Sequence, residues 1–126
     1  MALIVNPITP DNQGLCRCAE FLAPVKTWKD IAKRHDEQNQ FSQSLRIVSD
    51  RREDWSIDLY RCIDCSRYWA REFVSRRNGY YFFYHVESDD PEHWLDHNVF
   101  WGGVMRRLRK HRDDPDYVAL IVPYLD

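Results

Sequence analysis

The sequence predicts an α+β fold in which two to three helices flank an antiparallel β-sheet. Three observations carry this prediction: strict alternation of apolar and polar residues at 55–60, a hairpin turn at Asn78-Gly79, and a helix start at Thr27. A chain of 126 residues has the length of one domain with one modest core. We therefore expect a single α+β domain over residues 1–126.

The strands of the first half are short and are separated by turn-forming residues. Ala2–Val5 predicts an edge strand, and residues 6–14 predict a loop because they are rich in Asn, Pro and Gly. Residues 45–48 predict a second strand, which a charged turn at 50–54 ends.

A helix is expected between these strands. Thr27 is a good N-cap residue, and Asp30 three positions later can complete the cap, so the helix should run over about 28–39. Its apolar residues are few, which places it on the surface with one packed face.

Three consecutive strands are expected in the middle of the chain. The alternation over 55–60 puts apolar residues on one face and Asp58 with its polar neighbours on the other, the pattern of a half-buried strand. Residues 68–74 carry large apolar groups on both faces, so this strand should be central in its sheet. Asn78-Gly79 then leads into a strand over 80–86.

The last third favours helices. Ser88 to Pro91 supplies a cap and a proline for a helix from Pro91 to about His97. Residues 98–111 predict a second helix, or its continuation, despite Gly102-Gly103. Residues 117–122 fit a helix and a strand equally well.

The four cysteines predict a structural zinc site. A Cys-x-x-Cys turn at Cys62 and Cys65 joins two predicted strands, the outline of a zinc-knuckle hairpin, and lets two thiolates converge on one ion. Cys16 and Cys18 are the remaining cysteines, and they would complete a four-thiolate shell across the 43 residues that separate Cys18 from Cys62. Four thiolates leave no open coordination position for catalysis. Free core thiols and a redox or disulfide role are the alternatives.

The composition bounds the compartment and the class of partner. No secretory signal and no apolar run of transmembrane length is visible, so we expect a cytoplasmic protein, in which cysteines stay reduced and available to a metal. The formal net charge of −2 argues against generic binding to nucleic acid.

No catalytic set can be argued from the spacing of the residues, so we expect a protein without enzymatic activity. His93 and His97 are four residues apart, but Trp94 stands where a metalloprotease helix needs glutamate. The sequence also lacks a phosphate-binding glycine loop.

One basic run keeps a nucleic-acid alternative open. Residues 106–112 hold five Arg and Lys residues, which could follow a phosphate backbone if they shared a face. Cations also suit the last turns of a helix, and the acidic residues that follow at 113, 114 and 116 neutralise much of this charge.

The stretch Leu59-Tyr60-Arg61-Cys62-x-x-Cys65-x-x-Tyr68-Trp69 resembles a segment of small zinc-ribbon-like proteins, some of which look like immunity proteins of bacterial polymorphic toxin systems. The resemblance covers about residues 59–69, with Cys16 and Cys18 as upstream partners. Ser66 stands where such knuckles commonly have glycine, so a distorted turn is expected.

The resemblance implies a protein that binds a cognate toxin or effector and blocks it by occlusion. A cationic toxin cleft would be met by acidic and aromatic side chains. The residues expected to bind this partner are Asp89, Asp90, Glu92, Trp94 and Asp96. The alternative is a zinc-ribbon protein that binds nucleic acid, or acts as a regulator, through the run 106–112.

Overall fold

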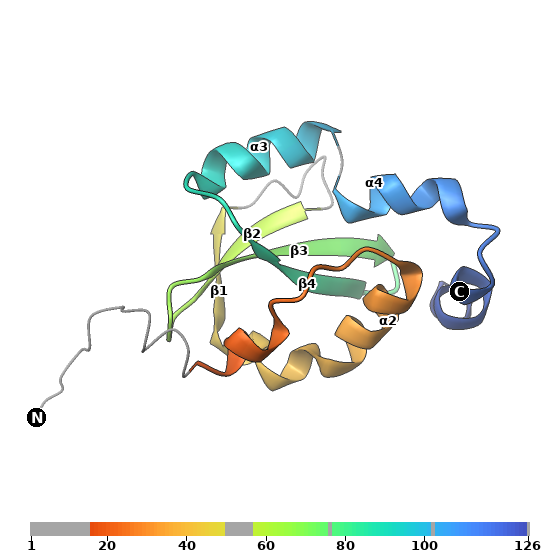
Figure 1. Cartoon of the computed structure of the whole chain (residues 1–126), viewed down its shortest axis with the longest axis horizontal. Helices are drawn as coiled ribbons and strands as arrows, with labels where there is room; N and C mark the ends of the chain where they lie inside the picture. Colours follow the sequence, from red (N-terminus) through yellow and green to blue (C-terminus); the bar gives the residue numbers. More distant parts are fainter. Residues whose placement is uncertain (1–15, 50–56, 76, 102, 126) are drawn as a thin grey trace, which may run out of the picture.

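A computed structural model describes residues 16–49, 57–75, 77–101 and 103–125, and it contains a four-stranded antiparallel sheet with helices around it (Figure 1). The strands, in their order across the sheet, are β1 (Leu45–Ser49), β2 (Ile57–Cys62), β3 (Tyr68–Ser75) and β4 (Tyr80–Val86). The predicted α+β class is confirmed, and β3 is central as expected. The strand predicted at 2–5, the loop at 6–14, the turn at 50–54 and the first residues of the strand at 55–60 lie outside the described residues.

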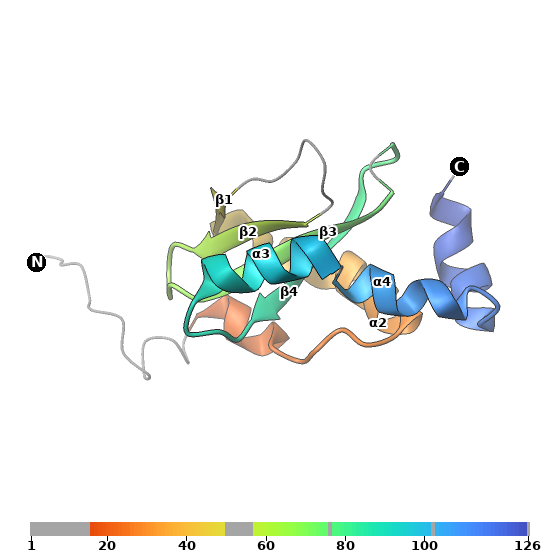
Figure 2. The ribbon, with the colours of Figure 1, turned by 90° about the horizontal axis from the view of Figure 1, so that it is seen from above.

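The sheet separates two apolar clusters. Leu59, Ala70 and Phe82 belong to the larger cluster on one face, which α3 (Pro91–Trp101) and α4 (Val104–Leu108) cover. Trp69 and Phe83 belong to the smaller cluster on the other face. Figure 1 places α3 and α4 above the sheet and the chain from residue 17 to the end of α2 (Trp28–Glu37) below it, and Figure 2 shows α3 and α4 following each other along the upper face.

The remaining helical segments are short. They are η1 (Arg17–Phe21), η2 (Gln38–Gln40), η3 (Ser42–Ser44), η4 (Arg109–His111) and η6 (Val122–Tyr124), which are 3-10 turns, and η5 (Tyr117–Ile121), which is a π-helical turn. Residues 117–122 are therefore helical, which decides between the two predicted conformations. No helix in the described ranges is both long and apolar enough to cross a membrane.

The prediction that Asp58 lies on a solvated strand face is wrong. Asp58 is fully buried, and its Oδ2 accepts a hydrogen bond from Arg71 Nη2 of the neighbouring strand at 2.6 Å. A charged side chain can occupy a buried strand position when a cross-strand partner of opposite charge reaches it.

Helix α2 starts at the predicted cap. The Thr27 side chain accepts the Asp30 N–H at 3.1 Å, and the Asp30 carboxylate accepts the Thr27 N–H at 3.1 Å, which forms a capping box. The helix lies along the outer edge of β4, where two of its polar residues take the place of another strand. Arg34 Nη1 donates to the Phe83 carbonyl at 2.7 Å, and Gln38 both accepts the Phe83 N–H and donates to the Tyr81 carbonyl.

These contacts explain why the packed face of α2 has few apolar residues. Arg34 and Gln38 are each only 4% exposed, so the buried face of the helix is partly polar. An uncovered strand edge would offer unpaired N–H and C=O groups to other chains, and α2 removes this hazard at β4.

Helix α3 runs past its predicted end at about His97 to Trp101, as the predicted continuation allowed, and the helical region is broken at Gly103 before α4 begins at Val104. Beyond the break, the buried Glu72 carboxylate of β3 accepts the N–H groups of Val104 at 3.0 Å and Met105 at 2.6 Å. Gly103 is required by close approach, because a Cβ atom there would lie 2.3 Å from Glu72 Oε1. The sheet thus binds the first N–H groups of α4 through one carboxylate.

Candidate metal centre

Two segments far apart in the sequence bring the four cysteines together. Cys16 immediately precedes η1 and Cys18 lies within it, while Cys62 ends β2 and Cys65 lies in the turn that leads to β3. Their four sulfur atoms all lie within 4.8 Å of one another. Three of the residues are buried and Cys16 is half-buried, so the group is closed to solvent on most sides.

The spacing of the sulfur atoms fits a tetrahedral metal site. Thiolates held at about 2.3 Å from a zinc ion lie roughly 3.8 Å apart from each other. The Sγ–Sγ distances are 3.6 Å for Cys16 and Cys62, 3.5 Å for Cys16 and Cys18, and 3.2 Å for Cys18 and Cys65. A disulfide would need about 2.05 Å, so all four cysteines are free thiols. These four residues could hold one zinc ion, with no position left for a substrate.

The protonation of the thiols also bears on the donor set. Burial raises the pKa of Cys18 far above its ordinary value, and burial raises the pKa of Cys62 to about 11. Burial acts on Cys65 in the same direction, but hydrogen bonds from the Arg67 backbone and from neighbouring thiols outweigh it and lower the Cys65 pKa. Metal binding needs thiolates, so a cation bound here would displace the protons of Cys18 and Cys62, which burial favours.

Arg67 supplies positive charge beside the sulfur atoms. Its Nη1 lies 4.0 Å from Cys18 Sγ. Burial disfavours the charged guanidinium, yet the hydrogen bonds and charges of Cys65 and Cys18 outweigh that effect and raise the Arg67 pKa. Four thiolates around a divalent ion carry a net charge of about −2, and the guanidinium offsets part of it. The sequence analysis did not single out Arg67. The one signal that could have indicated it is its position, two residues after Cys65.

The knuckle turn adopts the conformation expected of a glycine without having one. Ser66 has a φ of 65°, in the left-handed region. The Ser66 N–H donates to the Cys62 carbonyl and the Cys62 N–H donates to the Arg67 carbonyl, both at 2.9 Å, so the turn is closed by backbone bonds. Arg61 Nη2 donates to Ser66 Oγ at 2.8 Å and holds the side chain in place.

Aromatic rings pack against the cysteine group. The Phe41 ring stacks on Phe21, with centroids 4.8 Å apart, and contacts the Trp69 ring at 4.7 Å. These residues share one buried cluster with Cys18, Cys62 and Cys65. A metal here would crosslink the smaller core of the protein to its N-terminal segment, which is a structural role.

The residues expected to bind a partner lie at the start of α3. Asp89, Glu92 and Asp96 are exposed, and Asp90 Oδ1 accepts the His93 N–H at 3.1 Å, which makes Asp90 the cap of the helix. Trp94 is half-buried, and the centroids of its ring and the Tyr84 ring are 6.1 Å apart. Much of the Trp94 side chain therefore packs against the larger apolar cluster. The acidic residues thus share a surface, whereas Trp94 contributes only part of its ring.

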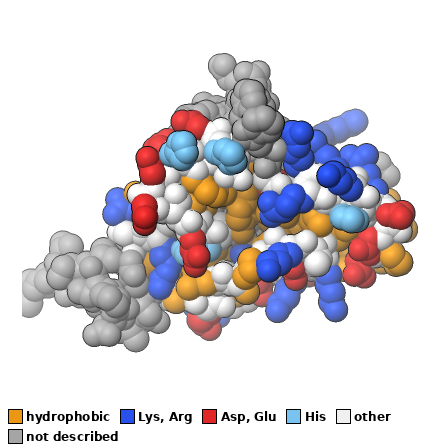
Figure 3. Space-filling model, turned by 45° about the horizontal axis from the view of Figure 1, so that its top comes forward, with side chains coloured by type: hydrophobic (Ala, Val, Ile, Leu, Met, Phe, Trp, Pro, Cys, Tyr) orange, Lys and Arg blue, Asp and Glu red, His pale blue; other side chains and the backbone are white. Residues whose placement is uncertain are grey.

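The face that carries α3 and α4 has separated charges. In Figure 3 most side chains over one end are acidic or histidine, whereas Lys and Arg side chains predominate over the other end, with further acidic side chains among them. The cations of the basic run are all exposed: Arg106, Arg107, Arg109, Lys110 and Arg112. His93 and His97 are exposed on α3, and within the described residues only the four cysteines form a group that could hold a metal.

Comparisons with known proteins gave no match. No protein-family model matches the chain, and no curated protein and no solved structure gives a significant match. The function is therefore inferred from the geometry described above and from the short resemblance around the knuckle.

Proposed function

We propose that this chain is an immunity-type protein: it binds a cognate bacterial toxin or effector, blocks it by occlusion, has no enzymatic activity, and is held in shape by a structural zinc ion. The observation that carries the proposal is the exposed acidic surface at the start of α3, made of Asp89, Asp90, Glu92 and Asp96. Toxins that act on nucleic acid or on other anionic substrates have cationic clefts, and an acidic surface complements such a cleft in charge.

The local sequence strengthens this electrostatic argument. Residues 87–97 contain five acidic side chains and no Lys or Arg. Charge complementarity accelerates association and selects the partner, which a protein that must capture a toxin quickly requires. The closed four-cysteine group supports a binding role, since its residues can stabilise a fold but offer no open position for chemistry.

The test is protection of a bacterial host that expresses the product of the gene immediately upstream. Co-expression of the wild-type chain should restore growth, and a triple variant Asp89→Lys, Glu92→Lys, Asp96→Lys should lose protection by at least about tenfold in surviving cells. Asp90 is left unchanged because it caps α3.

The matched control makes the same change in net charge at exposed acidic residues elsewhere. Its substitutions are Asp36→Lys, Asp113→Lys and Asp116→Lys. Protection by the control but not by the α3 variant supports the proposal. Equal protection by both variants, or a neighbouring product that is harmless to the host, would overturn it.

The basic run favours a second candidate, a nucleic-acid-binding or regulatory protein. Its five cations are exposed on α4, η4 and the residue that follows. In this case Arg106→Glu, Arg107→Glu and Arg109→Glu together should abolish a salt-sensitive complex with single- or double-stranded oligonucleotides in a fluorescence anisotropy titration. Absence of any such complex for the wild type removes this candidate.

A further inference from the structure

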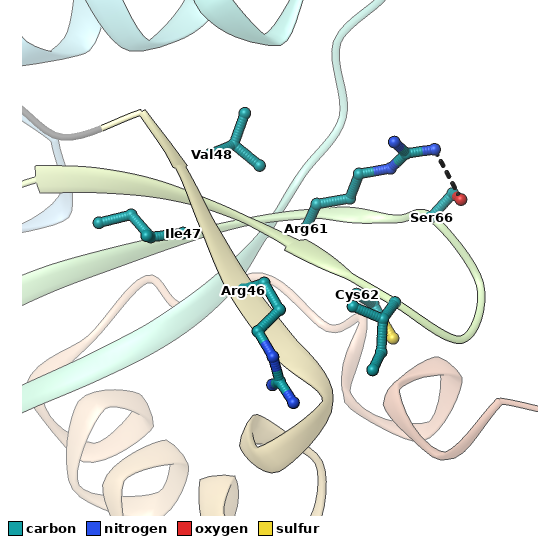
Figure 4. Close-up of a pocket in the computed structure, with 7 residues that line it drawn as sticks. Arg46, Ile47, Val48, Arg61, Cys62 and Ser66 are labelled. Atoms are coloured by element: carbon teal, nitrogen blue, oxygen red, sulfur yellow. Dashed lines mark hydrogen bonds between the residues drawn. The ribbon is translucent and has the colours of Figure 1, made fainter.

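A groove of about 380 Å³ lies along β1 and the knuckle turn, and none of its lining residues belongs to the acidic surface of α3. Its lining comes from Arg46, Ile47 and Val48 of β1 and from Arg61, Cys62, Ile63 and Ser66 of β2 and the knuckle turn. In Figure 4 the side chains of Ile47 and Val48 project to opposite sides of β1. Strand β1 is one of the two edge strands of the sheet in the described ranges. The groove therefore joins an exposed strand edge to an exposed set of side chains.

Two arginines lie directly opposite each other in this groove. Arg46 of β1 is the cross-strand neighbour of Arg61 of β2, and like charges in such pairs are destabilising. Arg46 Nη1 donates to the carbonyls of Gln43 and Leu45, and Arg61 donates to Ser66, so within the described residues neither is bonded to a carboxylate. Figure 4 shows the two guanidinium groups pointing in opposite directions, away from each other. Both cations line the groove and would be neutralised by an anionic ligand.

The groove also gathers exposed aliphatic side chains. Ile47 is 49% exposed, Val48 is 45% exposed and Ile63 is 59% exposed. These are three of the five large apolar side chains that are exposed in the described part of the chain. An exposed apolar patch rimmed by charge is typical of a binding surface.

The two edges of the sheet differ in whether other residues bond to their backbone groups. Arg34 and Gln38 of α2 bond to the outer edge of β4, whereas no described residue pairs with the outer edge of β1 in the same way. Because the Ile63 N–H donates to the Ser44 carbonyl, alternation along the ladder turns the backbone groups of Ile47 away from β2. Such groups can accept an added strand.

We infer that this groove binds an extended segment of a partner protein in which acidic and aliphatic side chains alternate. The segment adds as a strand beside β1, so its side chains alternate between the two faces of the sheet: its carboxylates meet Arg46 and Arg61 on one face, and its aliphatic side chains cover Ile47 on the other. The aliphatic lining favours a peptide over a nucleic acid, because bases stack on aromatic rings and no lining residue is aromatic. The inference is independent of the proposed toxin-binding surface, with which it shares no residue.

The first experiment follows backbone amide shifts of the isotopically labelled wild-type chain as a short peptide alternating Glu and Val is added. Shifts concentrated at residues 45–48 and 61–66 are expected. A peptide alternating Lys and Val should leave these signals unchanged. Shifts centred on residues 106–112 would overturn the inference, as would equal binding of the Lys-Val peptide. Perturbation of the groove by a single-stranded oligonucleotide and not by the Glu-Val peptide would overturn it in favour of nucleic acid.

Variants then separate charge from backbone pairing. Arg46→Glu with Arg61→Glu should raise the Kd for the Glu-Val peptide at least about tenfold, while Arg106→Glu with Arg109→Glu should leave it unchanged. Ile47→Pro removes the outward N–H at an edge position that tolerates proline, and it should also weaken binding at least about tenfold. Unchanged affinity in the folded double arginine variant would overturn the inference.

Discussion

Removal of the metal crosslink is the perturbation whose size follows most directly from the structure. The sulfur cluster joins Cys16 and Cys18 to Cys62 and Cys65, and 43 residues separate Cys18 from Cys62. A crosslink that closes a loop of this length restricts the unfolded chain by about 4 kcal/mol on a chain-entropy estimate. In a domain of this size that corresponds to a fall in Tm of roughly 12–20 °C.

The assay combines native mass spectrometry with calorimetry on protein purified without a histidine tag. The wild type should carry one zinc ion per chain, and Cys62→Ser should carry none and melt lower by the stated amount. Ile63→Ser is the matched control, because it places serine in the same turn at a residue that is 59% exposed and supplies no sulfur. It should retain both the metal and the melting temperature.

The chelated wild type provides an independent arm. Removing the metal with a strong chelator should lower the Tm of the wild type to near that of Cys62→Ser, and added zinc should restore it. A metal-free wild-type chain that melts at the same temperature as the zinc-treated sample would refute the crosslink. The four cysteines would then be core thiols, one of the alternatives that the sequence left open.

Three further changes test other features of the fold. Ser66→Gly should raise the free energy of unfolding by about 1 kcal/mol, because Ser66 has a φ of 65°. If urea titration instead gives a lower free energy of unfolding for this variant, the lost hydrogen bond from Arg61 outweighs the relief of backbone strain. Gly103→Ala should lower the free energy of unfolding by about 1–3 kcal/mol, since the new Cβ would lie 2.3 Å from Glu72 Oε1. The control Gly79→Asn lies at a site with open space and a φ of 66°, so it should be nearly neutral. Equal effects of the two substitutions would contradict the close approach of Gly103 to Glu72. Burial raises the pKa of Glu72 above its ordinary 4.5. As pH rises, the Glu72 carboxyl therefore loses its proton in the unfolded chain before it does so in the folded protein, and the folded protein loses stability between pH 4.5 and the folded-state pKa. Thermal melts of zinc-saturated Glu72→Gln should lack this loss, and a decline equal to that of the wild type would exclude Glu72 as its source.

Features with local causes were predictable from the sequence. The capping box needs only Thr27 and Asp30, three residues apart, and both bonds are present. Asn78-Gly79 gave the β3–β4 hairpin because a positive φ at Gly79 is a property of the residue itself. The cysteine pairs were predictable for the same reason: each half of the cluster is a short local pattern, and only four cysteines exist to be combined.

Features that depend on distant partners were not predictable. The burial of Asp58 depends on Arg71 of the next strand, and the polar packed face of α2 depends on Arg34 reaching the carbonyl of Phe83. The sequence around Glu72 does not indicate a special role for this residue, because its hydrogen bond with the Val104 N–H depends on the tertiary fold. Periodicity reports which residues share a face of one element, but it carries no information on what another element brings to that face.

The cysteine cluster and the β1 groove meet at the same turn. Cys62 contributes its sulfur to the cluster and also lines the groove, and Ser66, whose backbone closes the knuckle, bonds to Arg61 in the groove. A metal that fixes Cys62 and Cys65 would therefore also fix the position of the Arg61 guanidinium relative to β1. Binding of a partner segment would then need less ordering of the groove, because rigid sites lose less conformational entropy on association. In this arrangement a metal with a purely structural role at one side of the turn contributes to recognition at the other.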